Sequence, residues 1–120
     1  MKVAVASQGP DLNSQVALRF GRARYFLIVD TASGAFIGHT NAGNLSTAHT
    51  AGMQAAGAVL SLGVSAVITR SIGPKAFATL QAGKVEVYAT ASETGEDAIE
   101  RLKAGQLRPV QEANMQEHWM

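Results

Sequence analysis

The feature that most constrains the fold is a helix–strand–helix pattern across residues 44–83. Small and apolar residues at helical spacing run to about residue 62, and Ser46 or Thr47 can cap the helix that they predict. Residues 64–69 are mostly apolar and predict a buried strand, which a second helix follows. A helix, a strand, a loop and a helix in this order form a crossover unit, so the pattern predicts a partly parallel sheet.

The two predicted helices of this unit have recognisable ends. Gly63 ends the first, Pro74 suits the first position of the second because a helix start needs no N–H there, and Gly83 stops the second. Further on, Thr94 with Asp97 three residues later is a capping pattern for a third helix, which runs to residue 103.

Four more strands are predicted on either side of the unit. Alternating apolar residues, or aromatic and β-branched ones, mark them at residues 2–6, 25–30, 35–41 and 84–89. Gly34 lies in the loop between the second and third, where a hairpin needs a positive φ. The predicted order is β-β-β-α-β-α-β-α, a mixed five-stranded sheet flanked by helices in the α/β class.

The composition excludes several classes of protein. A chain of 120 residues with 47% hydrophobic and 16% charged residues is expected to form one globular domain. We expect that domain at residues 1–107 and a C-terminal tail at 108–120. The net charge of +1 gives no general attraction to nucleic acid or membrane, and no apolar run approaches the ~18 residues of a membrane helix. We therefore expect a cytoplasmic protein, either a monomer or a weak homodimer.

The first candidate binding residues are Arg19, Arg22 and Arg24, which share one short turn. Guanidinium groups suit bidentate contact with oxyanions and sulfide-rich anions. The alternative is a solvated turn whose arginines pair with Asp11, Asp30 or glutamates.

A second candidate is His49, close to the start of the first long helix. Its imidazole can ligate a metal or contact an anion, and the helix N-terminus favours negative charge there. The alternative is a surface or capping histidine, because no second histidine has ligand spacing. Met53 lies four residues on and is interpreted as a core residue, although a thioether is also a soft metal ligand.

The third candidate is the loop with Arg70, Ser71 and Gly73, between the strand at 64–69 and the helix at Pro74. Ligands of parallel sheets collect where strands end and helices begin. An ordinary strand-to-helix turn remains the alternative.

Familiar catalytic patterns are missing. The chain has no cysteine, so structural disulfides and cysteine-ligated clusters are excluded. It has no glycine-rich phosphate loop and no nucleophile with a matching histidine and acid. The strand at 2–6 carries no carboxylate, which argues against two-metal nuclease chemistry.

Several segments together resemble a known family. They are Met1-Lys2-Val3-Ala4-Val5-Ala6-Ser7, Phe20-Gly21-Arg22-Ala23-Arg24-Tyr25-Phe26, His49-Thr50-Ala51-Gly52 and Gly73-Pro74-Lys75-Ala76-Phe77. In this order they are similar to the dinitrogenase iron–molybdenum cofactor biosynthesis family, the group that includes NifX, the C-terminal part of NifB and the orange protein.

The resemblance implies a ribonuclease H-like three-layer fold without nuclease residues. It also implies a non-enzymatic carrier of an anionic metal–sulfur cluster, either the iron–molybdenum cofactor or a precursor, or a molybdenum/copper sulfide. Possible partners are cluster-assembly proteins. The residues expected to hold the cluster are the three arginines of the turn, His49 as a metal ligand, and Gly52, Arg70, Ser71 and Gly73.

Two other functions remain open from the residues alone. The same helix starts could bind a small phosphate or carboxylate substrate, although the chain shows no credible general base. A regulatory subunit that docks through His118-Trp119-Met120 is the third possibility.

Overall fold

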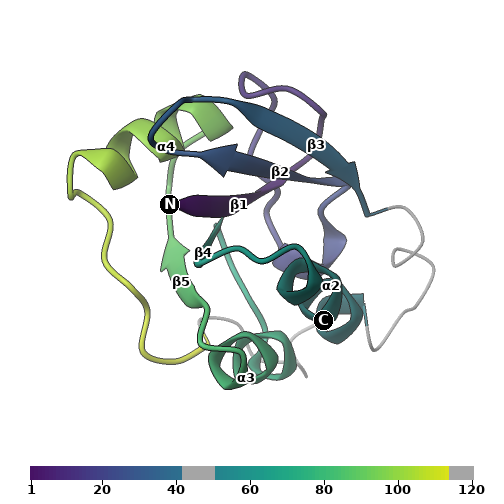
Figure 1. The fold of residues 1–120 in the computed structure, drawn as a ribbon. Coiled ribbons are helices and arrows are strands. Elements are labelled where there is room, and N and C mark those ends of the chain that lie inside the picture. Colours follow the sequence, from purple (N-terminus) through teal and green to yellow (C-terminus); the bar gives the residue numbers. More distant parts are fainter. Residues whose placement is uncertain (42–50, 114–120) are drawn as a thin grey trace.

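The structure has the predicted order of elements. It is a computed structural model and describes residues 1–41 and 51–113 (Figure 1). Its strands within these residues are β1 (Lys2–Ser7), β2 (Tyr25–Asp30), β3 (Phe36–Thr40), β4 (Ala66–Thr69) and β5 (Glu86–Ala89). A short 3-10 helix, η1 (Phe20–Arg22), precedes the α-helices α2 (Ala51–Ser61), α3 (Pro74–Ala82) and α4 (Gly95–Lys103). The predicted α/β class and mixed five-stranded sheet are confirmed.

The strand order in the sheet is β3-β2-β1-β4-β5. β2 is antiparallel to both of its neighbours, whereas β1, β4 and β5 run parallel. The three parallel strands therefore end at the same edge, which we call the carboxyl edge. Gly34 has the predicted positive φ, 80°, in the hairpin between β2 and β3.

The central strands β1, β2 and β4 are largely buried, and helices lie on both faces of the sheet, so the chain folds into three layers. α2 and α3 pack on one face, where Ala55, Val59 and Leu80 belong to one buried cluster with Ala4 and Val67 of the sheet. α4 covers the other face through Ala98 and Ile99. Figure 1 shows α4 apart from the pair α2 and α3.

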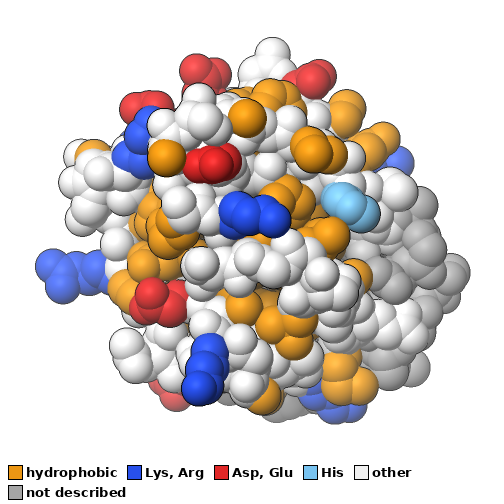
Figure 2. All heavy atoms as spheres, viewed as in Figure 1, with side chains coloured by type: hydrophobic (Ala, Val, Ile, Leu, Met, Phe, Trp, Pro, Cys, Tyr) orange, Lys and Arg blue, Asp and Glu red, His pale blue; other side chains and the backbone are white. Residues whose placement is uncertain are grey.

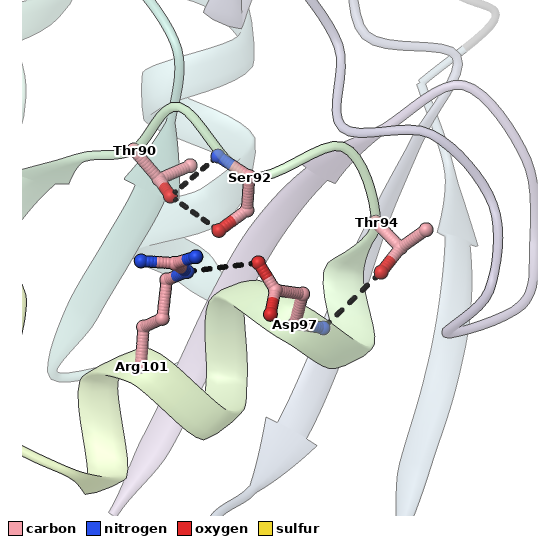
Figure 3. A network of polar contacts seen from close by, with 5 residues as sticks. All are labelled: Thr90, Ser92, Thr94, Asp97 and Arg101. Atoms are coloured by element: carbon pink, nitrogen blue, oxygen red, sulfur yellow. Dashed lines mark hydrogen bonds and ion pairs between the residues drawn. The ribbon is translucent and has the colours of Figure 1, made fainter.

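The start of α4 is tied down by polar contacts (Figure 3). The Thr94 hydroxyl accepts a hydrogen bond from the Asp97 backbone N–H at 3.2 Å, as the capping pattern predicts. The Asp97 carboxylate accepts one from Arg101 Nε at 2.9 Å, and hydrogen bonds from Arg101 and then Ser92 lower the pKa of Asp97. Beside them, the buried hydroxyl of Thr90 donates to Ser92 Oγ at 2.8 Å. This helix start is thus satisfied by its own side chains.

Replacing the cap of α4 should destabilise the protein moderately. Thr94→Ala leaves the Asp97 N–H without its acceptor, and we expect a loss of about 1 kcal/mol in the free energy of unfolding. Thr94→Ser, which keeps the hydroxyl, should lose much less. Urea unfolding followed by circular dichroism measures both, and equal losses would show that the cap does not account for the effect.

The segment after α4 returns to the sheet. The Val110 N–H donates to the Val87 carbonyl at 2.8 Å, and Pro109 bridges to Tyr88. The first residues beyond 107 thus lie along β5, while His118, Trp119 and Met120 fall outside the described residues. No helix in the described part of the chain is long and apolar enough to span a membrane.

Candidate functional site

The arginine turn, residues 19–24, is fixed to the carboxyl edge of the sheet. The Arg24 N–H donates to the carbonyl of Ser7, the last residue of β1, at 3.0 Å. Asn41 follows β3 and holds the same turn twice: its N–H donates to the Arg24 carbonyl and its Nδ2 to the Ala23 carbonyl, both at 2.8 Å. The turn is therefore anchored where strands β1 and β3 end.

On its other side the turn is joined to the loop after β4. The Phe20 N–H donates to the Ser71 carbonyl at 2.9 Å, and the Ser71 hydroxyl donates to the Leu18 carbonyl at 2.6 Å. The buried hydroxyl of Thr69, at the end of β4, donates to the same Ser71 carbonyl at 3.1 Å. The turn with Arg19 and the loop with Arg70 and Ser71, predicted from separate parts of the chain, thus lie side by side.

Glycines bring the turn against two helix starts. A Cβ on Gly21 would lie 2.6 Å from both the Cα and the N of Gly52, so the backbones of η1 and α2 touch. A Cβ on Gly52 would in turn lie 3.3 Å from the Cβ of Ala76 in the first turn of α3. The arginine turn, the start of α2 and the start of α3 therefore meet, and we call this region, with its exposed arginines, the convergence site.

The charges at the convergence site favour an anion. The first turns of α2 and α3 contain no acidic residue, and Gly73 at the start of α3 offers no side-chain cap. α4 differs, because Glu96 and Asp97 lie in its first turn next to its cap. Two helix N-termini each carry partial positive charge, and here they meet beside arginines rather than acids.

The arginines of the turn are oriented outward. Arg19, Arg22 and Arg24 have exposed side chains, and within the described part of the chain Arg19 and Arg24 form no ion pair. The alternative in which these two pair with Asp11, Asp30 or glutamates thus finds no support there. Arg70 is half-buried.

Two expectations about the start of α2 have different outcomes. His49, the expected metal ligand, lies outside the described residues. Met53, interpreted as a core residue, is 42% exposed, so that interpretation is wrong. Its neighbours in sequence explain this: Ala51 and Ala55 face the core, and Met53 lies on the other side of the helix.

The donor set at this surface is cationic. In the described ranges no three His, Cys, Asp or Glu side chains gather as a metal site, and the whole chain lacks cysteine. What the convergence site offers is guanidinium groups and backbone amides. These groups donate hydrogen bonds to the outer atoms of a bound anion, and they do not coordinate a bare metal ion.

Two glycines of this site provide a matched test of the close approach. Gly21→Ala forces a methyl group into the Gly52 backbone, and we expect a loss of about 1–3 kcal/mol in unfolding free energy. Gly57→Ala, inside α2 with nothing within 4 Å of the new Cβ, should instead stabilise by about 0.5–1 kcal/mol. Thermal and urea unfolding compare them, and a neutral Gly21→Ala would contradict the described contact.

Comparison with known proteins finds relatives that match most of the chain. The family model described as dinitrogenase iron-molybdenum cofactor matches residues 1–105. The apo form of the orange protein from Desulfovibrio gigas superposes with a TM-score of 0.92, at 34% identity over 95% of this chain and 96% of that one. A Thermotoga protein provisionally named as NifB gives a TM-score of 0.74, at 37% identity over 90% and 91% of the two chains.

A further relative also aligns with most of the chain. An uncharacterized protein of Methanocaldococcus jannaschii is 28% identical over 109 residues, which is 89% of each chain. The family model covers nearly all of the sheet and helices described above, and the resemblance expected from the sequence is confirmed. The chain belongs to the dinitrogenase iron–molybdenum cofactor family.

Proposed function

We propose that this protein is a non-catalytic carrier of an anionic metal–sulfur cluster and that the convergence site holds the cargo. The observation that carries the proposal is the contact of Gly21 with Gly52 and of Gly52 with Ala76. It joins an arginine turn to two helix starts free of acidic residues in a chain of this family.

The chemistry of the cargo follows from that of the site. A sulfide-rich cluster such as the iron–molybdenum cofactor, its precursor or a molybdenum/copper sulfide carries diffuse negative charge, which planar guanidinium groups and amide N–H groups can neutralise. Because the chain has no cysteine, the cluster is held without thiolate bonds and can be released intact. Reversible capture of this kind suits a carrier.

Each site residue has a role in the proposal. Arg19, Arg22, Arg24 and Arg70 supply charge, Ser71 supplies a hydroxyl, and Gly52 and Gly73 allow close approach to backbone amides. His49 supplies a metal ligand from the segment before α2. Cluster-assembly proteins of the cytoplasm are the partners that would load and unload such a carrier.

The proposal is tested by adding tetrathiomolybdate with copper, and separately iron–molybdenum cofactor, to the apoprotein. We expect new visible absorbance and metal that co-migrates with the protein in gel filtration. Inorganic phosphate should compete only weakly, because its charge is compact and strongly hydrated. Tight phosphate binding with no thiometallate binding would instead favour a small phosphorylated ligand.

His49 has its own test within this proposal. His49→Ala should weaken cluster binding without lowering the melting temperature, whereas His39→Ala, a histidine substitution on β3, should leave binding unchanged. Equal binding by the two variants would remove His49 from the site and leave the arginine turn as the proposed contact.

A further inference from the structure

Within the described residues no further strand pairs with the edge strand β3, in contrast to the other edge of the sheet. All five residues of β3 are exposed, and none is proline, lysine, arginine or an acid, the residues that commonly protect edge strands. At the opposite edge, the chain itself covers β5 through Pro109 and Val110. Among residues 1–41 and 51–113, one edge is thus covered by the chain and the other is not.

The backbone of β3 offers hydrogen-bonding groups to a further strand. The Asp30 backbone N–H donates to the Ala35 carbonyl at 2.9 Å, and the Asn41 backbone N–H donates to the Arg24 carbonyl at 2.8 Å. Paired and unpaired positions alternate along an antiparallel strand, so Ile37, in register with Ile28, bonds to β2. The N–H and C=O groups of Phe36 and Gly38 therefore face away from the sheet.

An apolar groove lies beside this edge. It has a volume of about 350 Å³ and is lined by Ile28, Ile37 and Leu62 together with Lys2, Asp30 and His39. Ile37 is 69% exposed and Phe36 is 37% exposed. Figure 2 shows hydrophobic side chains on this face with Lys or Arg, acidic and histidine side chains among them.

We propose that a second copy of this chain pairs with β3 as an antiparallel strand about a two-fold axis at Ile37. In this register Phe36 of each copy bonds to Gly38 of the partner subunit, using the outward-facing groups. The two Ile37 side chains then meet directly, as a pair without hydrogen bonds between them, where cross-strand side chains are closest. Two sheets become one, and the most exposed apolar side chain of β3 is buried.

Charges support a second copy as the occupant. In this register His39 lies opposite Ala35 of the partner subunit. On the same face, Asp30 of the partner subunit lines the groove next to that Ala35. Backbone hydrogen bonds from Ala32 and Ser33 lower the pKa of Asp30, so it presents a carboxylate. Each histidine therefore faces a groove that holds the Asp30 carboxylate, with Lys2 one strand further away, and the two-fold axis repeats the arrangement.

The covered β5 edge explains why assembly stops at two copies. A chain with two open edges could add strands without limit, whereas an isologous contact through one open edge closes on itself. The groove lies toward the amino end of β1, where Lys2 is, whereas the convergence site lies beyond Ser7 at the carboxyl end. Pairing through β3 thus leaves the proposed cluster surface accessible and does not depend on it.

The absence of cysteine makes a crosslinking test possible. Residues opposite each other in a pair without hydrogen bonds have Cα atoms about 4.5 Å apart, within disulfide range. We expect Ile37→Cys to form a disulfide-linked dimer rapidly under mild oxidation at low protein concentration. Phe36→Cys, which lies opposite Gly38 in this register, and Leu18→Cys, 65% exposed on another surface, should crosslink much more slowly.

The mass of the unmodified protein is measured in parallel. Sedimentation equilibrium should give about twice 12.5 kDa for the full chain, the monomer mass for Ile37→Lys and the dimer mass for the control Leu18→Lys. Circular dichroism checks that each variant is folded. A wild-type monomer at all concentrations, a dimer that survives Ile37→Lys, equal crosslinking of the three cysteine variants, or a monomer that binds an extended foreign peptide at β3 would each overturn the proposal.

Discussion

Replacing Arg19, Arg22 and Arg24 together by glutamine is expected to weaken thiometallate binding about 100-fold while the protein stays folded. The side chains are exposed, so each charged contact is worth about 1 kcal/mol after solvent screening, and three such contacts give about two orders of magnitude in Kd. Titration followed by visible absorbance measures the change. The effect should shrink as salt is added, because exposed charges are screened.

A matched variant separates this local effect from the overall charge. Arg101, Lys103 and Arg108 are also exposed, and the first two lie on α4, which covers the opposite face of the sheet from α2 and α3. Replacing these three by glutamine removes the same charge from the chain and should change Kd less than about threefold. Equal weakening by both triple variants would mean that general electrostatics, not the turn, attracts the anion.

Phe20→Ala is expected to cost about 3–5 kcal/mol in unfolding free energy, the largest stability effect at the site. The Phe20 side chain is 1% exposed, and its ring lies 5.1 Å from that of Phe26, centroid to centroid. It holds the arginine turn onto the same core that α2 and α3 cover. The loss of this ring leaves a cavity beneath the turn, which neighbouring side chains can fill only in part.

Phe20→Leu is the companion variant for this prediction. It keeps an apolar side chain of intermediate size and should recover more than half of the lost stability. Urea unfolding gives both values. A loss below about 1 kcal/mol for Phe20→Ala would show that η1 is not packed as described.

The sequence predicted the elements better than their ends. Residues 25–30 were predicted with the bounds that β2 has, since aromatic and β-branched residues stop sharply at the flanking turns. Residues 84–89 were also predicted as a strand, but β5 begins at Glu86. The structure explains the difference: Lys84 has a φ of 61° and the Val85 N–H donates to the Leu80 carbonyl, so both residues belong to the turn that closes the end of α3.

Gly83 ends α3 for a reason that the sequence does not show. It stops α3 as predicted, yet its φ is −86° and the left-handed conformation falls on Lys84. A Cβ on Gly83 would lie 2.4 Å from a methyl carbon of Leu60. The glycine therefore leaves room for the Leu60 side chain where α2 lies against the end of α3, a contact that sequence alone does not reveal.

The sequence predicted the separate parts of the candidate site but not which of them meet in the fold. Arginine chemistry identified the turn, and the strand-to-helix pattern identified the loop with Ser71. The contact of Gly21 with Gly52 joins residues far apart in the chain, and a glycine carries no sign of which backbone it will touch. Asn41, which fastens the turn through two hydrogen bonds, has no sequence pattern at all.

The most direct test of the central claim is a two-dimensional ¹H–¹⁵N NMR titration of the protein with tetrathiomolybdate and copper. The account predicts that the amide signals of Gly21, Gly52 and Ala76 shift or broaden together, because these residues meet at the convergence site. Amides of α4, whose N-terminus is capped by Thr94 and carries its own acids, should stay in place. Shifts confined to α4 or to β3, with the three site amides unchanged, would contradict it.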